Sequence, residues 1–592
     1  MKSFLKIFFA SFLAIIAVFV VFLFILGGIA GGSAPVLKPS ANSVLNLTLK
    51  GEITDRAYSN PFRNLSPMSA ITGSISDQST IGLFELKEVL KHAEKDDNIK
   101  GIFLNVDEVE AGPSTMFDLH HSLEAFRKSG KFIYAYSNAA GEMNLMLANV
   151  ADKFYMNPVG MCEFDGFAMQ REYMKGLYDK LGVDFKIFYV GEYKSATEGY
   201  RRTDMSAEDK EQRLALLVDM ESEYFKSLNK STGLSADSLR LLQNQLAVMN
   251  ANEAVSYRLA DGLRYEAQVW DEIKSKLGYK KSEEGSSISY AKYKEYIKLE
   301  LKAGKDPKLA VIYAEGVIND SKEEEGTIGG QAYVKMLQEA AKDDAIKAVV
   351  LRVNSPGGSA FASEQIYYAI QQLKAKKPIV VSMGDYAASG GYYISAPADK
   401  IIAQPTTITG SIGIYGIIPN LKKALNDKLG ITFDEVKTAE HANYMTLTND
   451  WDEAEMKKMQ QHIETGYGIF LDRVAKGRKM DTAAVNKVAR GRVWTGEDAK
   501  ALGLVDELGG LELAVSEAKK LAHLKQATLV TYPKEKTMIE SLMQSVFGDE
   551  QDAEAQAQLL KLSPQLLLLK QQERLKSLGI VQYMLPYDMK LK

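Results

Sequence analysis

Short apolar runs alternate with amphipathic stretches along the second half of the chain. The apolar runs are rich in Val and Ile, which is typical of buried strands. The amphipathic stretches place apolar residues three or four positions apart, which is typical of helices that cover a sheet. The expected strands are 309–316, 346–353 and 378–384, and the expected helices are 333–344 and 362–375. Strands that alternate with helices predict parallel β-α-β units and an α/β fold.

An internal repeat divides the chain into two similar halves. KDDNIKGIFLNV (95–106) resembles KDDAIKAVVLRV (342–353) at an offset of 247 residues, and VADKF (150–154) resembles PADKI (397–401) at the same offset. A period this long is typical of a duplicated domain, because solenoid repeats are much shorter. The expected units are a first domain, 45–280, a polar linker, 281–307, a second domain, 308–530, and an amphipathic tail of unassigned role, 531–592.

The N-terminus differs from both domains. Residues 7–30 carry no charge and are numerous enough to span a bilayer core as a helix. Lys2 and Lys6 precede this run, which favours an N-terminus that stays in the cytoplasm. A cleaved signal peptide is the alternative, but its apolar core is normally only about 7–15 residues long. We therefore expect residues 1–34 to be a single-pass anchor, with both domains on the extracytoplasmic side.

Composition changes this picture little but excludes several classes of function. The 592 residues carry a net charge of −4, and no basic stripe with interleaved aromatic residues is present, so a nucleic-acid partner is not expected. Cys162 is the only cysteine, which excludes an intrachain disulfide and a cysteine-rich zinc site. The six histidines form no HExxH pattern, so no metal site is expected.

Two glycine-rich stretches follow expected strands of the second half. LRVNSPGGSA and, further on, SMGDYAASGGYY keep bulky side chains away from Ser389. The backbone N–H groups of Gly357 or Gly358, together with that of Gly390, are uncovered by side chains and can donate to a developing oxyanion. The same residues also suit an ordinary strand-to-helix turn or close helix packing. Each stretch alone leaves both interpretations open.

Comparison of the two copies favours the chemical interpretation. At the offset of 247, Ser389 corresponds to Glu142, and the glycine turn corresponds to Glu110 and Ala111. Glycines that served the framework alone would be needed in both copies. The second copy is therefore the expected location of a nucleophilic serine.

The candidate base for this serine is a lysine of the first copy. No histidine lies between His121 and His441, so a nearby Ser-His pair is not indicated. Lys194, in VGEYKSA, is flanked by small residues, and a lysine whose pKa is depressed by burial can act as a base. Lys437, in the matching part of the second copy, is the competing candidate. The ordinary alternative for Lys194 is a solvated surface position.

With these motifs the chain resembles the long, tandem-domain form of bacterial signal peptide peptidase A. The resemblance rests on the apolar N-terminus, the duplication, VGEYKSA in the first copy, and NSPGGS, YAASGGYY and TGSIGI in the second, over about residues 1–530. It implies a ClpP/crotonase-like fold in both domains and a serine protease with a Ser-Lys dyad. Ser389 would be the nucleophile, Lys194 the general base, and Ser411 of TGSIGI the residue that orients the lysine.

The resemblance also implies a cellular role. Members of the family form homotetramers at the bacterial inner membrane and digest signal peptides left in the bilayer after export, without a metal or other cofactor. Two other classes stay open, a different enzyme of the crotonase fold and a membrane-tethered scaffold without activity. An extracytoplasmic location disfavours the acyl-CoA substrates of the former. A serine, a lysine and a glycine turn in complementary copies disfavour the latter.

Overall fold

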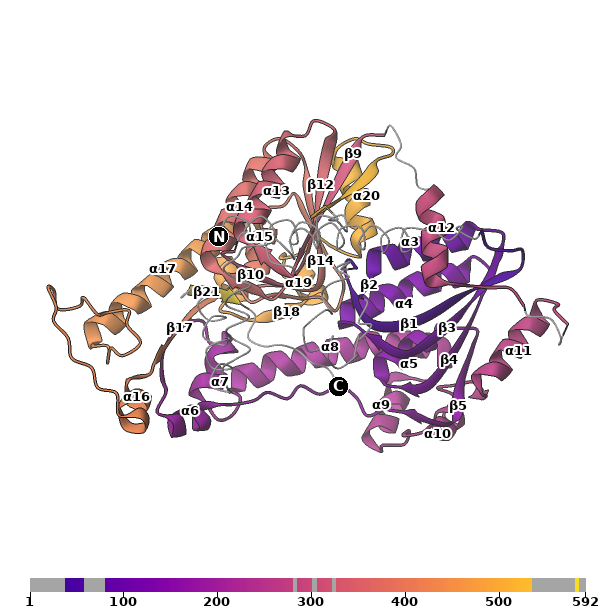
Figure 1. Cartoon of the computed structure of the whole chain (residues 1–592), viewed down its shortest axis with the longest axis horizontal. Coiled ribbons are helices and arrows are strands. Elements are labelled where there is room, and N and C mark those ends of the chain that lie inside the picture. Colours follow the sequence, from indigo (N-terminus) through magenta and orange to yellow (C-terminus); the bar gives the residue numbers. More distant parts are fainter. Residues whose placement is uncertain are drawn as a thin grey trace, which may run out of the picture.

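The computed structural model of the chain contains two similar α/β halves and a third sheet to which both contribute (Figure 1). The residues described are 38–57, 80–280, 285–300, 306–321, 326–534 and 581–584. The expected anchor, residues 1–34, and most of the expected tail lie outside the described residues. Within the described part of the chain, no helix is both long enough and apolar enough to cross a membrane.

The first half is built on a parallel sheet with the strand order β2-β1-β3-β4-β5-β7, and β8 also pairs with β1. The strands are β1 (Ser43–Thr54), β2 (Ile81–Gly82), β3 (Ile99–Glu110), β4 (Phe132–Ala140), β5 (Lys153–Cys162), β7 (Gly262–Leu263) and β8 (Ser287–Ser289). The helices are α3 (Leu83–Lys95), α4 (Pro113–Lys128), α5 (Glu142–Ala148), α6 (Lys175–Leu181), α7 (Glu198–Arg201), α8 (Ala207–Thr232), α9 (Ala236–Asn244), α10 (Ala251–Ser256), α11 (Glu266–Lys276) and α12 (Tyr290–Glu300), with a 3-10 turn η1 (Ser195–Thr197).

The second half repeats this plan with the strand order β18-β16-β14-β12-β9-β20, and β15 joins β14 to β19. Its strands are β9 (Lys308–Glu315), β12 (Ile346–Ser355), β14 (Ile379–Ala388), β15 (Lys400–Ala403), β16 (Ile408–Gly410), β18 (Val493–Thr495), β19 (Glu507–Leu508) and β20 (Thr528–Tyr532). Its helices are α13 (Gly330–Lys342), α14 (Ala360–Lys374), α15 (Gly390–Ser395), α16 (Lys422–Leu429), α17 (Glu453–Arg478), α18 (Thr482–Val488), α19 (Gly496–Ala501) and α20 (Leu511–Leu521).

The α/β architecture expected from the sequence is confirmed. The five elements expected in the second half correspond, within a few residues, to β9, α13, β12, α14 and β14. One segment differs from its expected character. Within the polar stretch 281–307, β8 pairs with β1 and α12 buries Tyr293 in the core of the first half. Apolar residues spaced along that stretch bind it to the first domain although its average composition is polar.

A third sheet joins the two halves. Its strand order is β11-β10-β13-β21-β17-β6. Its strands are β6 (Asp184–Val190), β10 (Val317–Asn319), β11 (Thr327–Gly329), β13 (Gly357–Ser359), β17 (Ile414–Asn420) and β21 (Val581–Met584). The first-half strand β6 pairs antiparallel with the second-half strand β17 along seven residues. The long helix α8 also extends from the first half to β18 of the second (Figure 1). Strand β6 and the N-terminal part of α8, up to Leu216, therefore pack against the second half, whereas Tyr224, Phe225 and Leu228 at the other end of α8 pack in the core of the first half.

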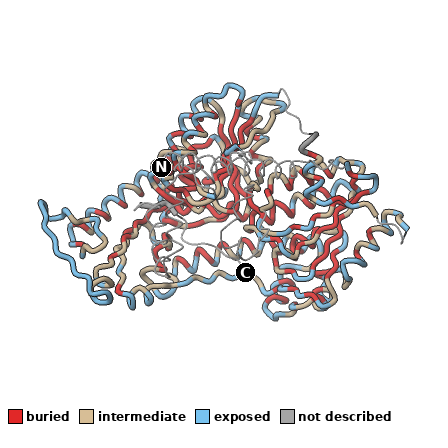
Figure 2. Tube along the Cα trace, in the orientation of Figure 1, coloured by how far each residue is buried: buried red, intermediate tan, exposed pale blue. Residues whose placement is uncertain are grey.

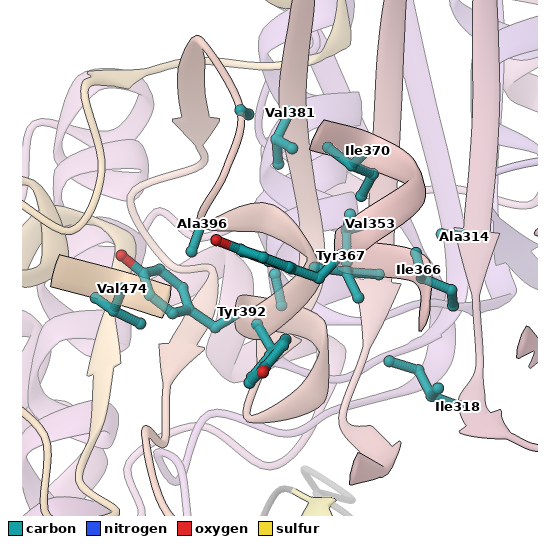
Figure 3. Close-up of a cluster of buried hydrophobic side chains, with 14 of the residues drawn as sticks. Ala314, Ile318, Val353, Ile366, Tyr367, Ile370, Val381, Tyr392, Ala396 and Val474 are labelled. Carbon is teal, nitrogen blue, oxygen red and sulfur yellow. The ribbon is translucent and has the colours of Figure 1, made fainter. Parts of the chain in front are cut away.

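Helix α15 is fixed by aromatic side chains in the core of the second half. Tyr392 and Tyr393 are fully buried, and Figure 3 shows Tyr392 in a cluster with Val353 of β12 and Tyr367 of α14. The hydroxyl of Tyr392 donates to Leu504 O at 2.9 Å. Burial of each such side chain stabilises the fold by roughly 1.5–3 kcal/mol. The start of α15, where Ser389 lies, is therefore rigidly placed.

Buried polar contacts lock the two halves together. The guanidinium of Arg352 on β12 pairs with Asp55, which follows β1, at 2.8 Å. Asp385 on β14 accepts hydrogen bonds from Thr115 N at 2.9 Å and Thr115 Oγ1 at 2.6 Å on α4. Figure 2 shows buried residues in the interior of both halves and in the region where they meet. The relative position of the two halves is therefore set by specific, desolvated contacts.

Candidate active site

Ser389 occupies the sharp turn between β14 and α15. Its φ is +56°, a backbone conformation that costs a residue other than glycine about 1–3 kcal/mol. Its N–H donates to Gly410 O at 2.9 Å, and its side chain is fully buried. A Cβ on Gly391 would lie 2.7 Å from Ser355 O. The small residues of AASGG are therefore a requirement of this turn.

Lys194 reaches the serine from the first half. Strand β6 ends at Val190, and the chain turns at Gly191, whose φ is +96°. Lys194 is fully buried. Its Nζ lies 2.9 Å from Ser389 Oγ, 3.0 Å from Ser411 Oγ and 3.1 Å from Ser411 O. The pairing of β6 with β17 thus carries a first-half lysine into the second half.

Burial lowers the pKa of Lys194 well below its ordinary value, because the charged ammonium would lose its hydration. The three oxygen atoms within hydrogen-bond distance of Nζ belong to two hydroxyls and a carbonyl. None of them supplies a full negative charge to stabilise the protonated form. A neutral lysine has a free lone pair, so this arrangement can take a proton from the Ser389 hydroxyl and activate it as a nucleophile.

Ser411 is held in position by the backbone of the second half. Its φ is +49°, and it follows Gly410, whose φ is +75°. The Ser411 N–H donates to Arg492 O at 2.7 Å. Both oxygen atoms of this residue contact Lys194 Nζ. These two oxygen atoms can accept the two N–H groups of a neutral amine, which leaves the nitrogen lone pair free to face Ser389.

The two adjacent glycines of β13 have backbone conformations that other residues rarely adopt. The φ angles are +100° at Gly357 and +155° at Gly358, and a Cβ on Gly358 would collide with Ile318 O. The Gly357 N–H donates to Ser355 Oγ at 3.1 Å. Of the two predicted oxyanion donors on this strand, Gly358 has the N–H that this contact does not engage. Gly390, the third predicted donor, is buried at the first position of α15.

The protein family described as "Peptidase family S49" matches two stretches of this chain, residues 125–280 and 371–525. These two matches cover more than half of the chain. The chain belongs to peptidase family S49. The family described as "Clp protease" also matches residues 311–408, which contain β12, β14 and β15 and most of β9.

Curated relatives agree with the S49 assignment. The chain is 36% identical to Protease 4 of Salmonella typhi over 529 residues, 87% of this chain and 84% of that protein. It is 30% identical to the chloroplastic serine protease SPPA of Arabidopsis thaliana, over 86% of this chain and 74% of that one. It is 41% identical to a putative signal peptide peptidase SppA of Enterococcus faecium, over 35% of this chain and 60% of that one.

These matches establish what kind of enzyme the S49 protein is. It is a serine protease made of two tandem S49 domains with a ClpP-like fold. The resemblance to signal peptide peptidase A drawn from the sequence motifs is confirmed. The protease activity excludes the alternative of a scaffold without activity.

The first half of the S49 protease holds a carboxylate where the second half holds its serine. Glu142 begins α5, and its buried Oε1 accepts hydrogen bonds from Asp165 N at 2.9 Å and Gly166 N at 2.7 Å. Burial raises the pKa of Glu142 to about 7, because a charged carboxylate is disfavoured there. The side chain holds the segment that follows β5, so this position has a structural role in the first half.

The competing lysine of the sequence analysis lies elsewhere. Lys437 is exposed on the segment that follows α16, and its Nζ pairs with Glu435 Oε1 at 3.0 Å. The structure therefore brings together Ser389, Lys194 and Ser411, and it does not bring Lys437 to them.

Two glycines that the sequence analysis did not single out make room for the lysine. A Cβ on Gly413 would lie 3.1 Å from Lys194 Cδ, and one on Gly491 would lie 2.6 Å from Lys194 Cβ. Gly491 also has a φ of +79°. Gly413 belongs to TGSIGI, so the motif contained a signal for it. Gly491 lies outside all four motifs on which the resemblance rests.

A buried polar network behind the lysine also escaped the sequence analysis. Gln212 Nε2 on α8 donates to Tyr193 O at 3.1 Å, and Gln212 Oε1 accepts from Val493 N at 3.2 Å. Ser195 Oγ donates to Asp209 Oδ1 at 2.6 Å. The residues on both sides of Lys194 are thus tied to α8, and α8 is tied to β18. Their polar residue types alone gave no hint of this arrangement.

Two groups of side chains in the described chain have the composition of a metal site. They are His120, His121 and Glu124 on α4, and His441, Asp452 and Glu455 in the second half. Glu124 is already paired with Lys230 at 2.6 Å, and Glu455 forms the capping box of α17. Neither group shares a residue with the contacts of Lys194.

Proposed function

We propose that the S49 protease is an endopeptidase in which Ser389 is the nucleophile and Lys194 the general base. The observation that carries the proposal is the 2.9 Å separation of Lys194 Nζ and Ser389 Oγ, with both side chains fully buried. A general base must lie within hydrogen-bond reach of the proton it takes and must be unprotonated at working pH. The lowered pKa of Lys194 supports the second requirement.

The proposed reaction proceeds through an acyl-enzyme. Neutral Lys194 takes the proton of the Ser389 hydroxyl as Oγ attacks the peptide carbonyl carbon. The lysinium then gives this proton to the leaving amine, and the C–N bond breaks. The neutral lysine then takes a proton from a water molecule whose oxygen attacks the ester carbonyl carbon. The bond to Ser389 Oγ breaks, the lysinium returns its proton to Oγ, and the peptide with its new carboxyl end leaves.

The remaining predicted residues take supporting roles in this proposal. Ser411 orients Lys194 through its two oxygen atoms. Gly358 and Gly390 supply the backbone N–H donors for the oxyanion, since the N–H of Gly357 is engaged with Ser355. Removal of one such donor costs a serine protease about 10²–10³ in kcat.

The proposed substrates are signal peptides that remain in the membrane after protein export. The support is the resemblance of the motifs and the match to a relative named as a putative signal peptide peptidase. Such peptides are apolar and lack stable tertiary structure. An enzyme that binds them as a strand gains affinity from main-chain hydrogen bonds without needing one side-chain sequence.

The decisive experiment is proteolysis of a synthetic signal peptide by the purified full-length chain. The wild type is expected to cleave it, and Ser389→Ala is expected to lower kcat/KM by at least about 10³-fold with an unchanged circular dichroism spectrum. Lys437→Ala, a change of the exposed lysine that competed with Lys194 as candidate base, serves as the control and should retain activity. Substantial turnover by folded Ser389→Ala would refute the nucleophile assignment.

We further propose that residues 1–34 anchor a homotetramer in the bacterial inner membrane, with both domains on the extracytoplasmic side. The support for the anchor is the uncharged run 7–30 behind Lys2 and Lys6. The tetramer is proposed from the resemblance to signal peptide peptidase A. Protease added to spheroplasts should degrade both domains, and sedimentation of the detergent-solubilised chain should give four copies. Domains that stay protected in intact spheroplasts, or a monomeric mass, would refute the respective part.

A further inference from the structure

Three side chains of α4 lie close together near the C-terminal end of α8. His120, His121 and Glu124 each offer one ligand atom, and these atoms lie within 4.8 Å of one another. Residues three and four positions apart share one face of a helix, so Glu124 lies one turn beyond both histidines. Two imidazoles and one carboxylate are a donor set that binds Zn²⁺ in proteins. Their arrangement on α4 is therefore suited to a metal ion.

The His120 ring is buried and lacks a hydrogen bond. The residue is only 3% exposed, and its Nδ1 has no hydrogen-bond partner among the described residues. Buried polar groups are nearly always hydrogen-bonded, so an exception calls for a bound water or ion. Because no hydrogen bond at Nδ1 fixes the tautomer, either ring nitrogen can present its lone pair to a metal. This availability distinguishes His120 from a histidine that is held by its neighbours in a core.

The other two side chains are able to close around an ion. The rings of His120 and His121 lie edge to face, with centroids 5.8 Å apart. Bonds of about 2.0–2.2 Å to a tetrahedral Zn²⁺ place its ligand atoms roughly 3.3–3.6 Å from one another. His121 is exposed and Glu124 is partly buried, so both side chains have room to rotate. Small rotations toward the buried His120 bring the three ligand atoms into this range.

We propose that His120, His121 and Glu124 form a binding site for one divalent transition-metal ion of the zinc type. Three protein ligands leave a fourth position for a water molecule. Ca²⁺ and Mg²⁺ are not expected there, because both require a shell of oxygen ligands. The site is separate from the proposed proteolytic chemistry, since none of its residues contacts the side chain of Lys194.

Lys230 of α8 competes with the ion for the carboxylate. Its Nζ lies 2.6 Å from Glu124 Oε1, and its side chain is 63% exposed. An exposed ion pair contributes little to stability, so the lysine can turn into solvent at small cost. Two positive charges on one carboxylate repel each other. The lysine therefore lowers the affinity of the site for metal without blocking it.

Calorimetric titration of Zn²⁺ into the full-length chain, free of any histidine tag, tests the site. Binding of one ion is expected, and His121→Ala and Glu124→Gln should each weaken it by at least about tenfold, because even residues that only orient metal ligands are worth that much. His441→Ala is the matched control, since it removes a histidine from the other group of this composition. It should leave binding unchanged. Absence of Zn²⁺ binding, or binding that depends on His441 and not on His121, would overturn the proposal.

Lys230 provides a second test, in which the affinity should rise. Lys230→Ala removes the competing charge and is expected to tighten Zn²⁺ binding by about threefold or more. Lys226→Ala removes another exposed lysine, one turn earlier on α8, whose partner is Glu223. This control should bind Zn²⁺ like the wild type. Equal affinities of the Lys230→Ala chain and the wild type would exclude Glu124 as a ligand and overturn the three-ligand site.

Discussion

The positions of Lys194 and Ser389 are each energetically unfavourable, and the surrounding structure maintains them. A lysine without a carboxylate partner is fully buried, and a serine holds a φ of +56°. Each feature is unfavourable in isolation, by desolvation in one case and by backbone conformation in the other. Rigid packing around α15 and the contacts of Ser411 maintain both. Such a combination in one place is typical of a catalytic site.

At this scale, the lysine variants give a direct prediction. Lys194→Ala should lower kcat/KM by at least about 10³-fold, and the double change with Ser389→Ala should be no worse, because residues that act as a unit are not additive. Lys194→Arg should be equally inactive, since a guanidinium does not give up its proton at working pH. Steady-state kinetics on the wild type and on the variants Ser389→Ala, Lys194→Ala, Lys194→Arg and the double change checks this. An active Lys194→Ala chain would contradict the proposed pair.

The buried lysine also predicts how activity and stability depend on pH. Since burial lowers its pKa, activity should fall as pH drops through that lowered pKa, because a protonated lysine accepts no proton. Between this lowered pKa and 10.5 the unfolded chain binds the extra proton, so this group makes stability rise with pH. The unfolding free energy of Lys194→Met relative to wild type should therefore decline as pH rises from 7 to 10.

Urea denaturation at several pH values measures this decline. Lys437→Met is the control, because it also replaces a lysine by methionine but at an exposed position. Its difference from the wild type should change little with pH. A pH-independent difference for Lys194→Met would show that the lysine is charged in the folded chain.

At the scale of elements, the strand pair β6–β17 and the helix α8 together position the lysine. Strand β6 sets the direction from which the chain arrives, and Gln212 on α8 connects Tyr193 to β18. The lysine loop is thus supported from two sides by elements of different halves. Its position depends on both contacts, although neither touches Ser389.

Gln212 is therefore predicted to act as a positioning residue. Gln212→Leu leaves Tyr193 O and Val493 N without these partners, at a cost of about 1–3 kcal/mol for each buried group. We expect kcat to fall about tenfold or more at nearly constant KM, with a shifted acid limb of the pH profile, because the lysine environment loosens. Lys210→Ala, an exposed change on the same helix, should do neither. A variant that loses stability but keeps the wild-type kcat and pH profile would limit Gln212 to a structural role.

How much of the structure could be predicted from the sequence differs from element to element. Alternating apolar and amphipathic runs placed β9, β12 and β14 because periodicity is a local property of the chain. The duplication pointed to Ser389 and Lys194, which the structure brings within 2.9 Å. The pairing of β6 with β17 and the role of Gln212 were beyond reach, since both depend on contacts between distant segments. No local pattern distinguishes that glutamine from a solvated one.

At the scale of the whole molecule, the two halves behave as one unit because charges are buried between them. Asp55 and Arg352 are almost fully buried, and Arg352 also donates to Ser382 Oγ and Met383 O. Lys87 of the first half is buried between Asp118 and Glu512, and Glu512 belongs to the second half. Removal of one partner from such a pair leaves an uncompensated charge in a dry environment.

Asp55→Ala is accordingly predicted to lower the free energy of unfolding by about 3–5 kcal/mol. The double variant Asp55→Ala, Arg352→Met should recover part of this loss, because the orphaned guanidinium is gone. Differential scanning calorimetry or urea denaturation of the full-length chain provides the comparison. An effect below about 1 kcal/mol for Asp55→Ala would show that water reaches the pair.

The division of the proposed catalytic pair between two halves has a consequence for biosynthesis. A nascent chain that has emerged as far as residue 280 carries Lys194 but lacks Ser389 and Ser411. The lysine loop also lacks β17 and β18, against which it is held in the finished molecule. On the proposed assignment of Ser389 and Lys194, such a partly synthesised chain has no proteolytic activity. The proposed site can then form only after synthesis has passed β18, which ends at Thr495, and the lysine loop has packed against the second half.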